Sequence, residues 1–404
     1  MTDMDPVETH LAEVLAAIRP LEPARLPLEA AEGAVLAEPA TAAGALPPFD
    51  NSSMDGYAVH ASDVAAASDA APVTLPVADQ IPAGDSRILT VAPGTCARIM
   101  TGAMLPGGAD AVVPVEWTSG GTGQVQFYRP VTKDHAIRRR GDDVAAGDEL
   151  LPAGSRLGPA QIALLAASGH DSAYARPAPR VAVIGTGNEL SDPGSPLRPG
   201  QIWDSNSYML AAAVRQAGGV AQRRRVGDDP GTVLAVIEEQ AAFADLVITS
   251  GGVSMGGEHD VVKAALSGHA TMTFRKVAMQ PGMPQGTGVI GPNQTPVLTL
   301  PGNPVSTYIS FCLFALPALA ALRGLPPVGL PHSRAELTAP VRSPEHKRSY
   351  LRGVLDAAAG TVTPLTGQGS HQLGALALAN ALIVVPEPVT SMEAGDIADV
   401  MSLP

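Results

Sequence analysis

The feature that most constrains the fold is a set of three short apolar segments, each followed directly by a glycine-bearing loop. The segments are Val181–Ile184, Leu246–Thr249 and Pro296–Leu300. Helices are predicted between and after them, at Ser205–Gln216, at Thr232–Ala242 and in the apolar stretch after Pro304. Wholly apolar strands that alternate with helices are typical of a mostly parallel sheet covered on both faces. The sequence therefore predicts a central α/β domain.

The chain on either side of this domain has a different pattern. Short apolar runs broken by Gly and Pro precede it, such as Val73–Val77 and Ala111–Val115, and similar runs such as Ala381–Val385 follow it. With 42 Gly and 38 Pro in 404 residues, such runs predict β-rich structure with many tight turns. Helices are predicted at Pro6–Arg19 and Pro159–Ser168.

We expect five parts along the chain. They are an N-terminal helix at 1–24 packed on the central domain, a linking domain made of 25–47 and 140–176, a β-rich domain at 48–139, the α/β domain at 177–328, and a small C-terminal β domain at 329–404.

Composition and charge exclude several functions. The 39 acidic side chains outnumber the 26 basic ones, and a net charge of −13 argues against non-specific binding to nucleic acid or to anionic membranes. Acidic residues follow both arginine triplets, Arg138–Arg140 and Arg223–Arg225, so local ion pairing is the simplest interpretation. The apolar run Ile309–Leu322 is shorter than the roughly 20 residues that span a bilayer, and Pro317 interrupts it. The two cysteines match no metal or redox spacing, so we expect a cytoplasmic protein.

The three strands predict where a ligand binds. In an open α/β sheet, ligands bind beyond the carboxyl ends of the strands, which here lead into Gly185–Leu190, Ser250–Gly257 and Pro301–Ser306. Glycines allow close backbone approach, and Asn303 can cap a helix that begins at Pro304, whose free N–H groups suit an anion. One such loop is as consistent with a plain turn, but three on one edge favour a phosphate-bearing ligand. None of them completes a dinucleotide fingerprint or a Walker loop.

Carboxylates accompany these loops. They are Glu189, Asp228, Asp229, Glu258 and Asp260. Each alone is better explained as a solvated side chain or a helix cap. As a set beside a phosphate-type site they favour Mg²⁺, which takes one or two carboxylates together with water and phosphate. Lys276 is a candidate cation for phosphate, or simply a surface lysine at a strand end.

Several ordered motifs resemble a known family. They are Pro48–Val59 (PFDNSSMDGYAV), Arg98–Ala103, Gly108–Val112, Arg138–Asp142, Thr186–Leu190, Ser250–Ser254 and Leu300–Ser306. In this order, from about residue 6 to the end, the chain resembles the MoeA family of molybdopterin molybdotransferases, which is related to the E domain of gephyrin. The resemblance implies that the central domain is MogA-like and that the C-terminal domain is a small β-barrel-like unit.

The resemblance also implies an activity. Members cleave the phosphoanhydride of adenylylated molybdopterin in a step that depends on Mg²⁺ and molybdate, insert molybdate into the dithiolene, and release AMP. They are homodimers whose site lies in a cleft between the MogA-like domain and the partner subunit. A molybdopterin adenylyltransferase that delivers the substrate, and molybdoenzymes that accept the product, are the implied partners.

The family's functional positions carry over motif by motif. Positions with a catalytic role are Asp55, Thr101, Asp142, Glu189, Asp228, Asp260 and Lys276. Of these, Glu189, Asp228 and Asp260 are expected to hold Mg²⁺, whereas Asp55, Thr101 and Asp142 are expected to reach across the dimer interface. Positions that line the pterin-phosphate pocket are Gly187, Ser250, Gly251, Gly252, Ser254, Pro301, Gly302 and Asn303. Ser306, Arg352 and Ser370 are expected to meet the molybdate oxyanion.

Three departures from the family affect this site. Asn188 stands where an aspartate is common, and His371 where a small residue is common. Gln280 and Met283 replace the two lysines of a Lys-Pro-Gly-Lys-Pro run that is associated with anion binding. This loss weakens oxyanion attraction unless another cation compensates. The candidates are Arg275, Lys276 and Arg352.

Two other functions compete with insertion of molybdate. The first is the preceding step, adenylylation of molybdopterin by ATP, but the separate adenylylating enzymes resemble only the middle domain. The second is a non-catalytic scaffold that binds peptides or cofactor-loaded enzymes. The loss of the two lysines favours a scaffold, whereas the carboxylates and the glycine loops argue against it.

Overall fold

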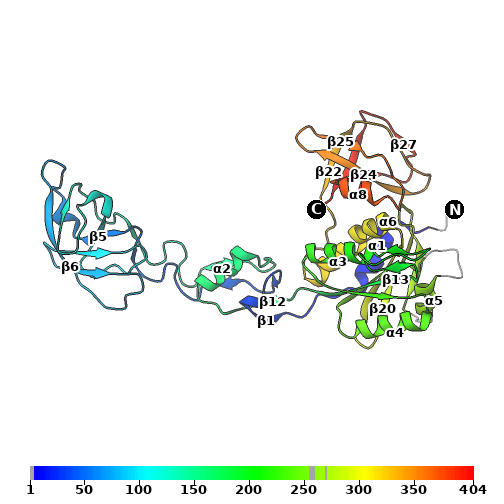
Figure 1. Ribbon diagram of the computed structural model, residues 1–404, viewed down its shortest axis with the longest axis horizontal. Helices are drawn as coiled ribbons and strands as arrows, with labels where there is room; N and C mark the ends of the chain where they lie inside the picture. The colour runs from blue at the N-terminus through cyan, green and yellow to red at the C-terminus, as the bar shows by residue number, and fades with distance from the viewer. Residues whose placement is uncertain (1–3, 254–259, 269–270) are drawn as a thin grey trace. The chain divides into compact units, whose positions relative to one another are not determined.

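The computed structural model describes residues 4–253, 260–268 and 271–404. The chain divides into two compact units (Figure 1). The large unit comprises Met1–Arg25, Gly33–Ala37 and Tyr174–Pro404, and the small unit comprises Leu26–Glu32 and Glu38–Ala173.

A six-stranded sheet forms the centre of the large unit, with strand order β16-β13-β17-β21-β20-β18. In chain order the strands are β13 (Arg180–Thr186), β16 (Val220–Val226), β17 (Leu246–Ser250), β18 (Thr273–Lys276), β20 (Pro284–Ile290) and β21 (Thr295–Leu300). The first four strands of the sheet order run parallel, and β20 runs antiparallel to both of its neighbours, β21 and β18. The three strands predicted from their apolar sequences are adjacent, which confirms the central α/β domain.

Helices cover both faces of this sheet, as its apolar strands require. They are α1 (Val7–Ala16), α3 (Asn206–Gln216), α4 (Pro230–Ala241), α5 (Val261–Leu266), α6 (Pro304–Ser310), η4 (Phe311–Ala315) and α7 (Leu316–Leu322). Figure 1 shows α4 and α5 on one side of the sheet and α1, α3 and α6 on the other. The buried residues form two corresponding clusters, one around Val183, Leu210 and Val305 and one around Ile184 and Ile237.

The segment Pro304–Leu322 is continuous and strongly apolar. By length and composition it could cross a membrane, but 78% of its most hydrophobic window is buried inside the protein. Its buried residues pack against α1 and the sheet, and the Cys312 side chain lies in this core. The segment is therefore the core helix that the sequence predicted.

A closed β-barrel forms the C-terminal part of the large unit. Its strands are β22 (His332–Leu337), β24 (Arg348–Asp356), β25 (Thr361–Pro364), β26 (Ala381–Val385) and β28 (Ile397–Ser402). The order β24-β25-β22-β28-β26 closes through pairing of β26 with β24. Inward-facing residues of these strands make a separate hydrophobic cluster. The helix α8 (Leu373–Leu378) and the short pair β23 (Val341–Arg342) and β27 (Ser391–Met392) complete this part.

One strand connects the barrel to the α/β part of the large unit. The short strand β19 (Met279–Gln280) lies between β18 and β20 in the sequence, yet it pairs in parallel with β24. Met279 is opposite Arg348 and Gln280 is opposite Ser349. The loop that follows β19 is therefore held against the C-terminal barrel.

A five-stranded sheet dominates the small unit, with order β8-β5-β7-β6-β9. The strands are β5 (Gly56–Val59), β6 (Val73–Ile81), β7 (Cys96–Ile99), β8 (Ala111–Pro114) and β9 (Gln124–Phe127). Tyr57 is fully buried, its ring packs edge-on against Phe127, and its hydroxyl donates to the carbonyl of Gly121 at 2.8 Å. A Cβ atom at Gly56 would lie 2.1 Å from the carbonyl oxygen of Val113, so only glycine fits there.

The remaining helices and strands of the chain are short. They are β1 (Ala24–Pro27), η1 (Leu28–Ala30), β2 (Val35–Leu36), β3 (Ala40–Thr41), β4 (Asn51–Ser52), η2 (Ala61–Val64), η3 (Val115–Trp117), β10 (Ile137–Arg138), β11 (Glu149–Leu151), α2 (Pro159–Ala167), β12 (Ser172–Arg176), β14 (Leu190–Ser191) and β15 (Ile202–Trp203). The pairs β2–β12 and β3–β11 join residues near 40 to residues near 150 and 175.

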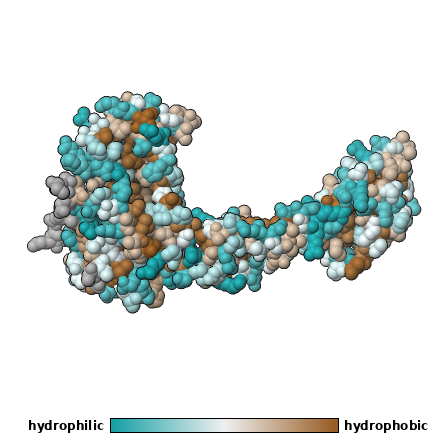
Figure 2. All heavy atoms as spheres, turned by 180° about the vertical axis from the view of Figure 1, so that it is seen from behind, coloured by the Kyte–Doolittle hydropathy of each residue, from teal (hydrophilic) through white to brown (hydrophobic). Residues whose placement is uncertain are grey.

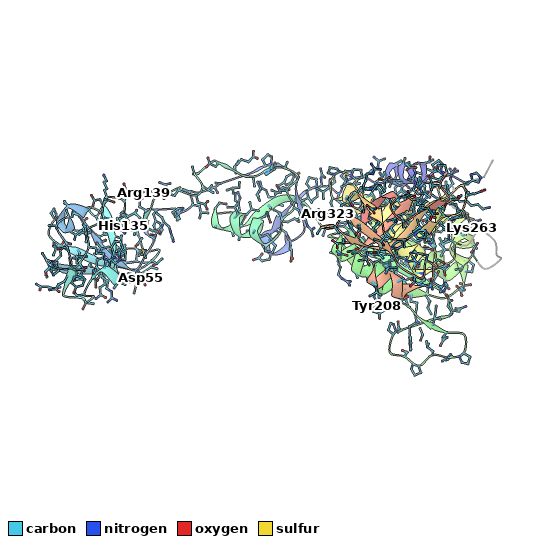
Figure 3. All side chains as sticks on the ribbon, turned by 90° about the horizontal axis from the view of Figure 1, so that it is seen from above. Asp55, His135, Arg139, Tyr208, Lys263 and Arg323 are labelled. Carbon is cyan, nitrogen blue, oxygen red and sulfur yellow. The ribbon has the colours of Figure 1, made fainter. Side chains whose placement is uncertain are left out.

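The guanidinium groups of Arg139 and Arg225 form ion pairs, but with carboxylates other than those that directly follow the triplets. Arg225 forms an ion pair with Asp192, and the guanidinium of Arg223 lies 3.4 Å from the ring centroid of Tyr208. Arg139, in the small unit, pairs with Asp50 and Asp134 (Figure 3). On the face shown in Figure 2, hydrophobic residues are interspersed with hydrophilic ones.

Candidate active site

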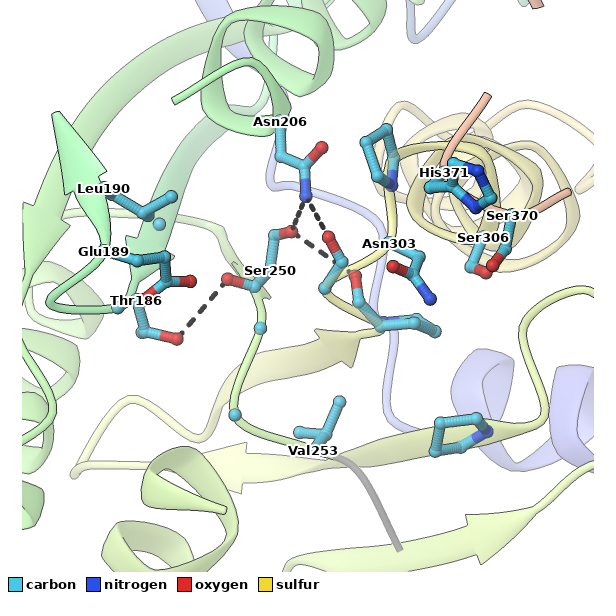
Figure 4. Close-up of a pocket in the computed structure, with 18 of the residues that line it drawn as sticks. Thr186, Glu189, Leu190, Asn206, Ser250, Val253, Asn303, Ser306, Ser370 and His371 are labelled. Carbon is cyan, nitrogen blue, oxygen red and sulfur yellow. Dashed lines mark hydrogen bonds between the residues drawn. The ribbon is translucent and has the colours of Figure 1, made fainter. Parts of the chain in front are cut away.

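A cavity of about 1150 Å³ lies at the carboxyl ends of β13, β17 and β21, where the sequence predicted a ligand site. The three glycine-bearing loops contribute to its wall (Figure 4). The predicted site residues that line it are Gly187, Glu189, Asp228, Ser250, Gly251, Gly252, Pro301, Gly302, Asn303, Ser306 and Ser370. The fold thus brings together most of the positions chosen from the sequence for the large unit.

Glycine is required at two turns of these loops. Gly251 has φ +101°, and a Cβ atom there would lie 2.9 Å from Oγ1 of Thr186. Gly187 has φ +144°, and a Cβ atom there would lie 2.3 Å from the carboxylate of Glu189. Both conformations are rare for other residues. The glycines therefore allow neighbouring backbone and the Glu189 carboxylate to pack closely at the cavity wall.

A hydrogen-bond network joins the second and third loops beneath the cavity. The Asn206 side-chain nitrogen donates to Oγ of Ser250 at 2.8 Å, to the carbonyl of Gly302 at 2.7 Å and to Oγ1 of Thr307 at 3.3 Å (Figure 4). Thr307 in turn donates to the carbonyl of Pro301 at 2.6 Å. Asn206 was not predicted as a site residue, although its place at the start of α3 puts it on the same sheet edge.

The start of α6 differs in one detail from the prediction. The helix begins at Pro304 and Asn303 occupies the cap position, but the Asn303 side chain makes no capping hydrogen bond. Its carbonyl instead accepts from the backbone N–H of Thr307 at 2.9 Å. The Asn303 side chain lines the cavity and, being free of capping, is available to a ligand.

Two of the three predicted metal ligands line the cavity. Glu189 and Asp228 belong to its wall, whereas Asp260 does not. Within the described residues there is no group of three or more His, Cys, Asp or Glu side chains spaced to hold a metal ion. Glu258 and Ser254 lie outside the described residues. A pair of carboxylates suits Mg²⁺, which completes its octahedral shell with water and phosphate oxygens.

Two of the cations predicted for this site, Lys276 and Arg352, do not line the cavity. Lys276 ends β18 outside the cavity wall. Arg352 is fully buried, and its guanidinium donates to the carbonyl oxygens of Gly367 at 2.5 Å and Gly369 at 3.1 Å. Burial of the guanidinium lowers the pKa of Arg352. Arg352 therefore holds the loop that leads to Ser370, rather than lining the cavity as the sequence predicted.

The far wall of the cavity comes from the C-terminal part of the chain and from the loop after β19. Gln280, Met283 and His371, the positions that depart from the family, all line it. The backbone N–H of Val305 donates to the carbonyl of Ser370 at 3.0 Å, which fixes this wall to α6. Lys347 also lines the cavity and was not predicted, because it belongs to none of the motifs on which the site was chosen.

The predicted residues of the β-rich domain lie in the small unit. Oδ1 of Asp55 accepts from the Thr101 backbone N–H at 2.7 Å and from its hydroxyl at 2.8 Å. The pKa of Asp55 is held below its usual range, mainly by the hydrogen bond from the Thr101 backbone N–H and next by the one from the Thr101 hydroxyl. The carboxylate of Asp142 accepts from the Arg139 backbone N–H at 2.5 Å. Asp55 and Thr101 thus form a close pair.

Together these features define a multidomain α/β protein with a pocket, lined by three glycine-bearing loops, at the carboxyl edge of its sheet. The N-terminal region of MoeA (domains I and II) matches residues 5–169, a probable molybdopterin binding domain matches residues 182–321, and the C-terminal region of MoeA (domain IV) matches residues 334–403. The chain belongs to the MoeA family.

Similar proteins extend over the same length. A protein of Mycobacterium tuberculosis named molybdopterin molybdenumtransferase 2 is 47% identical over 99% of this chain and 100% of its own. A molybdopterin molybdenumtransferase of Bacillus subtilis is 35% identical over 91% of this chain and 86% of its own. The crystal structure of a MoeA protein from Pyrococcus horikoshii matches with a TM-score of 0.75 and 33% identity, over 99% of both chains.

Proposed function

We propose that this protein is a molybdopterin molybdotransferase that inserts molybdate into adenylylated molybdopterin and releases AMP. The observation that carries the proposal is the pocket at the carboxyl edge of the sheet, where three glycine-bearing loops meet two carboxylates. Full-length similarity to enzymes named for this transfer supports it. The protein is thus an enzyme of molybdenum cofactor biosynthesis.

The roles of the pocket residues follow from their chemistry. The backbone N–H groups of Gly252 and of the Gly302–Asn303 segment suit phosphate oxygens, because these residues line the pocket. The Gly251 N–H is already used, since it donates to the carbonyl of Leu300 at 3.2 Å. Glu189 and Asp228 would hold Mg²⁺, which when bound neutralises charge on the phosphoanhydride. Ser306 and Ser370 offer hydroxyl donors to an oxyanion from the facing wall. The proposal assigns no ligand contact to Asp260 or Lys276.

In this proposal, the small unit of one subunit contributes to the pocket of a second subunit. Asp55, Thr101 and Asp142 carry family motifs but belong to a unit separate from the pocket. We therefore propose a cytoplasmic homodimer in which these residues act on the partner's pocket. A molybdopterin adenylyltransferase would supply the substrate, and molybdoenzymes would accept the product. The orienting pair Asp55–Thr101 supports this role, because a carboxylate held by two donors keeps its charge and direction.

The test is AMP release from adenylylated molybdopterin by the purified full chain. We expect release that requires both Mg²⁺ and molybdate, and formation of the molybdenum cofactor in equal amount. Release of AMP without molybdenum in the product would contradict insertion. Conversion of molybdopterin and ATP to the adenylylated form would support the alternative, the preceding adenylylation step. Tight binding of the substrate without turnover would support the scaffold.

A further inference from the structure

The pocket needs positive charge that the expected side chains do not supply. Its proposed ligands, a pyrophosphate and molybdate, are anions, and the wall already contains the carboxylates of Glu189 and Asp228. Of the three cations expected to replace the two family lysines, Arg275 pairs with Glu13 at 2.9 Å and with Asp5 at 3.5 Å. The other two lie outside the cavity wall, as described above. None of the three is therefore placed to bind an anion in the cavity.

Lys347 is the one lysine or arginine among the described residues that lines the cavity. Its side chain is half-buried, and no acidic side chain of the described residues lies within ion-pair distance of it. A half-buried ammonium group without a carboxylate partner is strongly attractive to an anion, because the low local dielectric increases the Coulomb energy. The next residue, Arg348, differs: it pairs with Glu8 at 2.5 Å and with Glu387 at 3.0 Å.

The fold fixes Lys347 beside the loop that has lost its lysines. Lys347 directly precedes β24, whose first residue is opposite Met279 and whose second is opposite Gln280. The Arg348 backbone N–H donates to the carbonyl of Ala278 at 2.9 Å. Oγ of Ser343 donates to the carbonyl of Lys347 at 3.4 Å, which holds the backbone on its other side. Lys347 and the Gln280–Pro284 loop therefore line the same wall.

We propose that Lys347 is the oxyanion-binding cation of this pocket and that it takes over, from the C-terminal barrel, the charge that Gln280 and Met283 no longer provide. The ligand is a tetrahedral oxyanion, either free molybdate or a phosphate group of the substrate. His371 and Ser370 lie on the same wall and add hydrogen-bonding groups. The identity of the anion rests on the proposed function, whereas the position of the Lys347 charge at the pocket wall does not depend on it.

Equilibrium dialysis of the full-length protein against molybdate tests the proposal without any turnover. Lys347→Gln should weaken molybdate binding by about 10- to 100-fold, the loss expected when a charge-assisted hydrogen bond is removed. Lys133→Gln is the matched control, because Lys133 is an exposed lysine of the small unit. It should bind as the unchanged protein does. Lys347→Arg should retain most of the affinity, since it retains the charge.

A lysine introduced at position 283 tests whether Lys347 replaces the charge of the missing lysines. Met283→Lys in the Lys347→Gln background should recover at least ten-fold in affinity, because it returns a cation to the same wall. Dialysis against AMP and pyrophosphate in place of molybdate distinguishes the two sources of oxyanion, and loss of either ligand in Lys347→Gln supports the proposal. Unchanged affinity for molybdate, AMP and pyrophosphate would overturn it. Absence of AMP release by the unchanged protein would instead count against the proposed function.

Discussion

Asn188 and Asp228 exchange hydrogen bonds between the loop after β13 and the loop after β16. The carboxylate of Asp228 accepts from the Asn188 backbone N–H at 2.8 Å, and the Asn188 side-chain oxygen accepts from the Asp228 backbone N–H at 3.3 Å. The residue that departs from the family thus positions a proposed metal ligand. A Cβ atom at Gly227 would lie 2.6 Å from that side-chain oxygen, so the glycine leaves space for the exchange.

Asp228 and its neighbour Asp229 should differ sharply when replaced. Asp228→Ala should abolish the Mg²⁺ dependence of AMP release and lower the rate at least 100-fold, with little change in stability, because the side chain is exposed. Asp229 caps α4 by accepting from the Thr232 backbone N–H at 2.8 Å. Asp229→Ala should therefore destabilise the fold by about 1 kcal/mol and leave the Mg²⁺ dependence intact. The measurements are Mg²⁺ titrations of activity and urea unfolding. A normal Mg²⁺ response in Asp228→Ala would remove this residue from the metal site.

The Asp55–Thr101 pair makes a prediction about pH. Thr101→Val removes the hydroxyl donor and keeps the backbone N–H, so the pKa of Asp55 should rise part of the way toward its ordinary value. Since the pKa is lowered in the folded state, the stabilisation by this pair is present above the unfolded pKa and is lost as pH falls through the folded pKa. Carboxyl carbon NMR of Asp55 measures the shift. Thr74→Val, which changes an exposed threonine elsewhere in the small unit, should leave the Asp55 titration unchanged.

His10 should make stability depend on pH under mild acid. Its ring is buried against Phe314 at 4.7 Å between centroids, and burial, reinforced by the charge of Arg275, lowers its pKa to about 4. Because the unfolded chain takes up a proton near pH 6.5 and the folded chain does so only near pH 4, stability is full above pH 6.5 and falls between these values. We expect a loss of about 2 kcal/mol between pH 7 and pH 5.

Urea unfolding at a series of pH values checks this expectation. His10→Leu should abolish most of the loss between pH 7 and pH 5, because it removes the group that titrates. His332→Gln serves as the control, since His332 is exposed, and should retain the full dependence. Equal pH dependence in all three proteins would show that other groups cause the acid sensitivity.

Arg352 should be a stability residue with a measurable effect on the pocket. Arg352→Leu leaves the carbonyl oxygens of Gly367 and Gly369 without their donor, so we expect destabilisation of about 2–4 kcal/mol. The loop to Ser370 should loosen, which raises the KM for molybdate more than it lowers kcat. Hydrogen exchange of residues 367–371 reports the loosening directly. Arg334→Leu, at an exposed arginine of the same barrel, should change neither the stability nor the hydrogen exchange of residues 367–371. Unaltered exchange in Arg352→Leu would contradict the positioning role.

The elements that the sequence predicted well are those buried on both sides. β13, β17 and β21 are apolar along their length because helices cover both faces of the sheet, and their loops meet at one edge for the same reason. The edge strand β16 was missed, since its Arg223–Arg225 run faces solvent and gives no apolar signal. The strand β20 was missed for a related reason. At Gly288 of β20, a Cβ atom would lie 2.4 Å from the carbonyl of Thr271, so close packing replaces the usual apolar pattern.

The site could be predicted only as far as motifs mark it. The glycine loops and Glu189 follow apolar strands and were found in this way, and Asp228 was found as one of the carboxylates that accompany these loops. The far wall depends on pairing between residues about 70 positions apart, β19 with β24, and no local pattern encodes such pairing. For that reason Arg352, a position carried over from the family, was assigned to the pocket, whereas Lys347 was overlooked.

The pairing of β19 with β24 also decides how this protein can be divided. A fragment that ends after α7 would retain the whole α/β sheet and the three glycine loops, and it would pass for a minimal pterin-binding module. It would nevertheless lack Lys347, Ser370 and His371, and the backbone groups of Met279 and Gln280 would lose their partners on β24. The C-terminal part therefore supplies one wall of the pocket, and gene fusions or domain exchanges that separate it from residues 279–284 would produce a pocket open on one side.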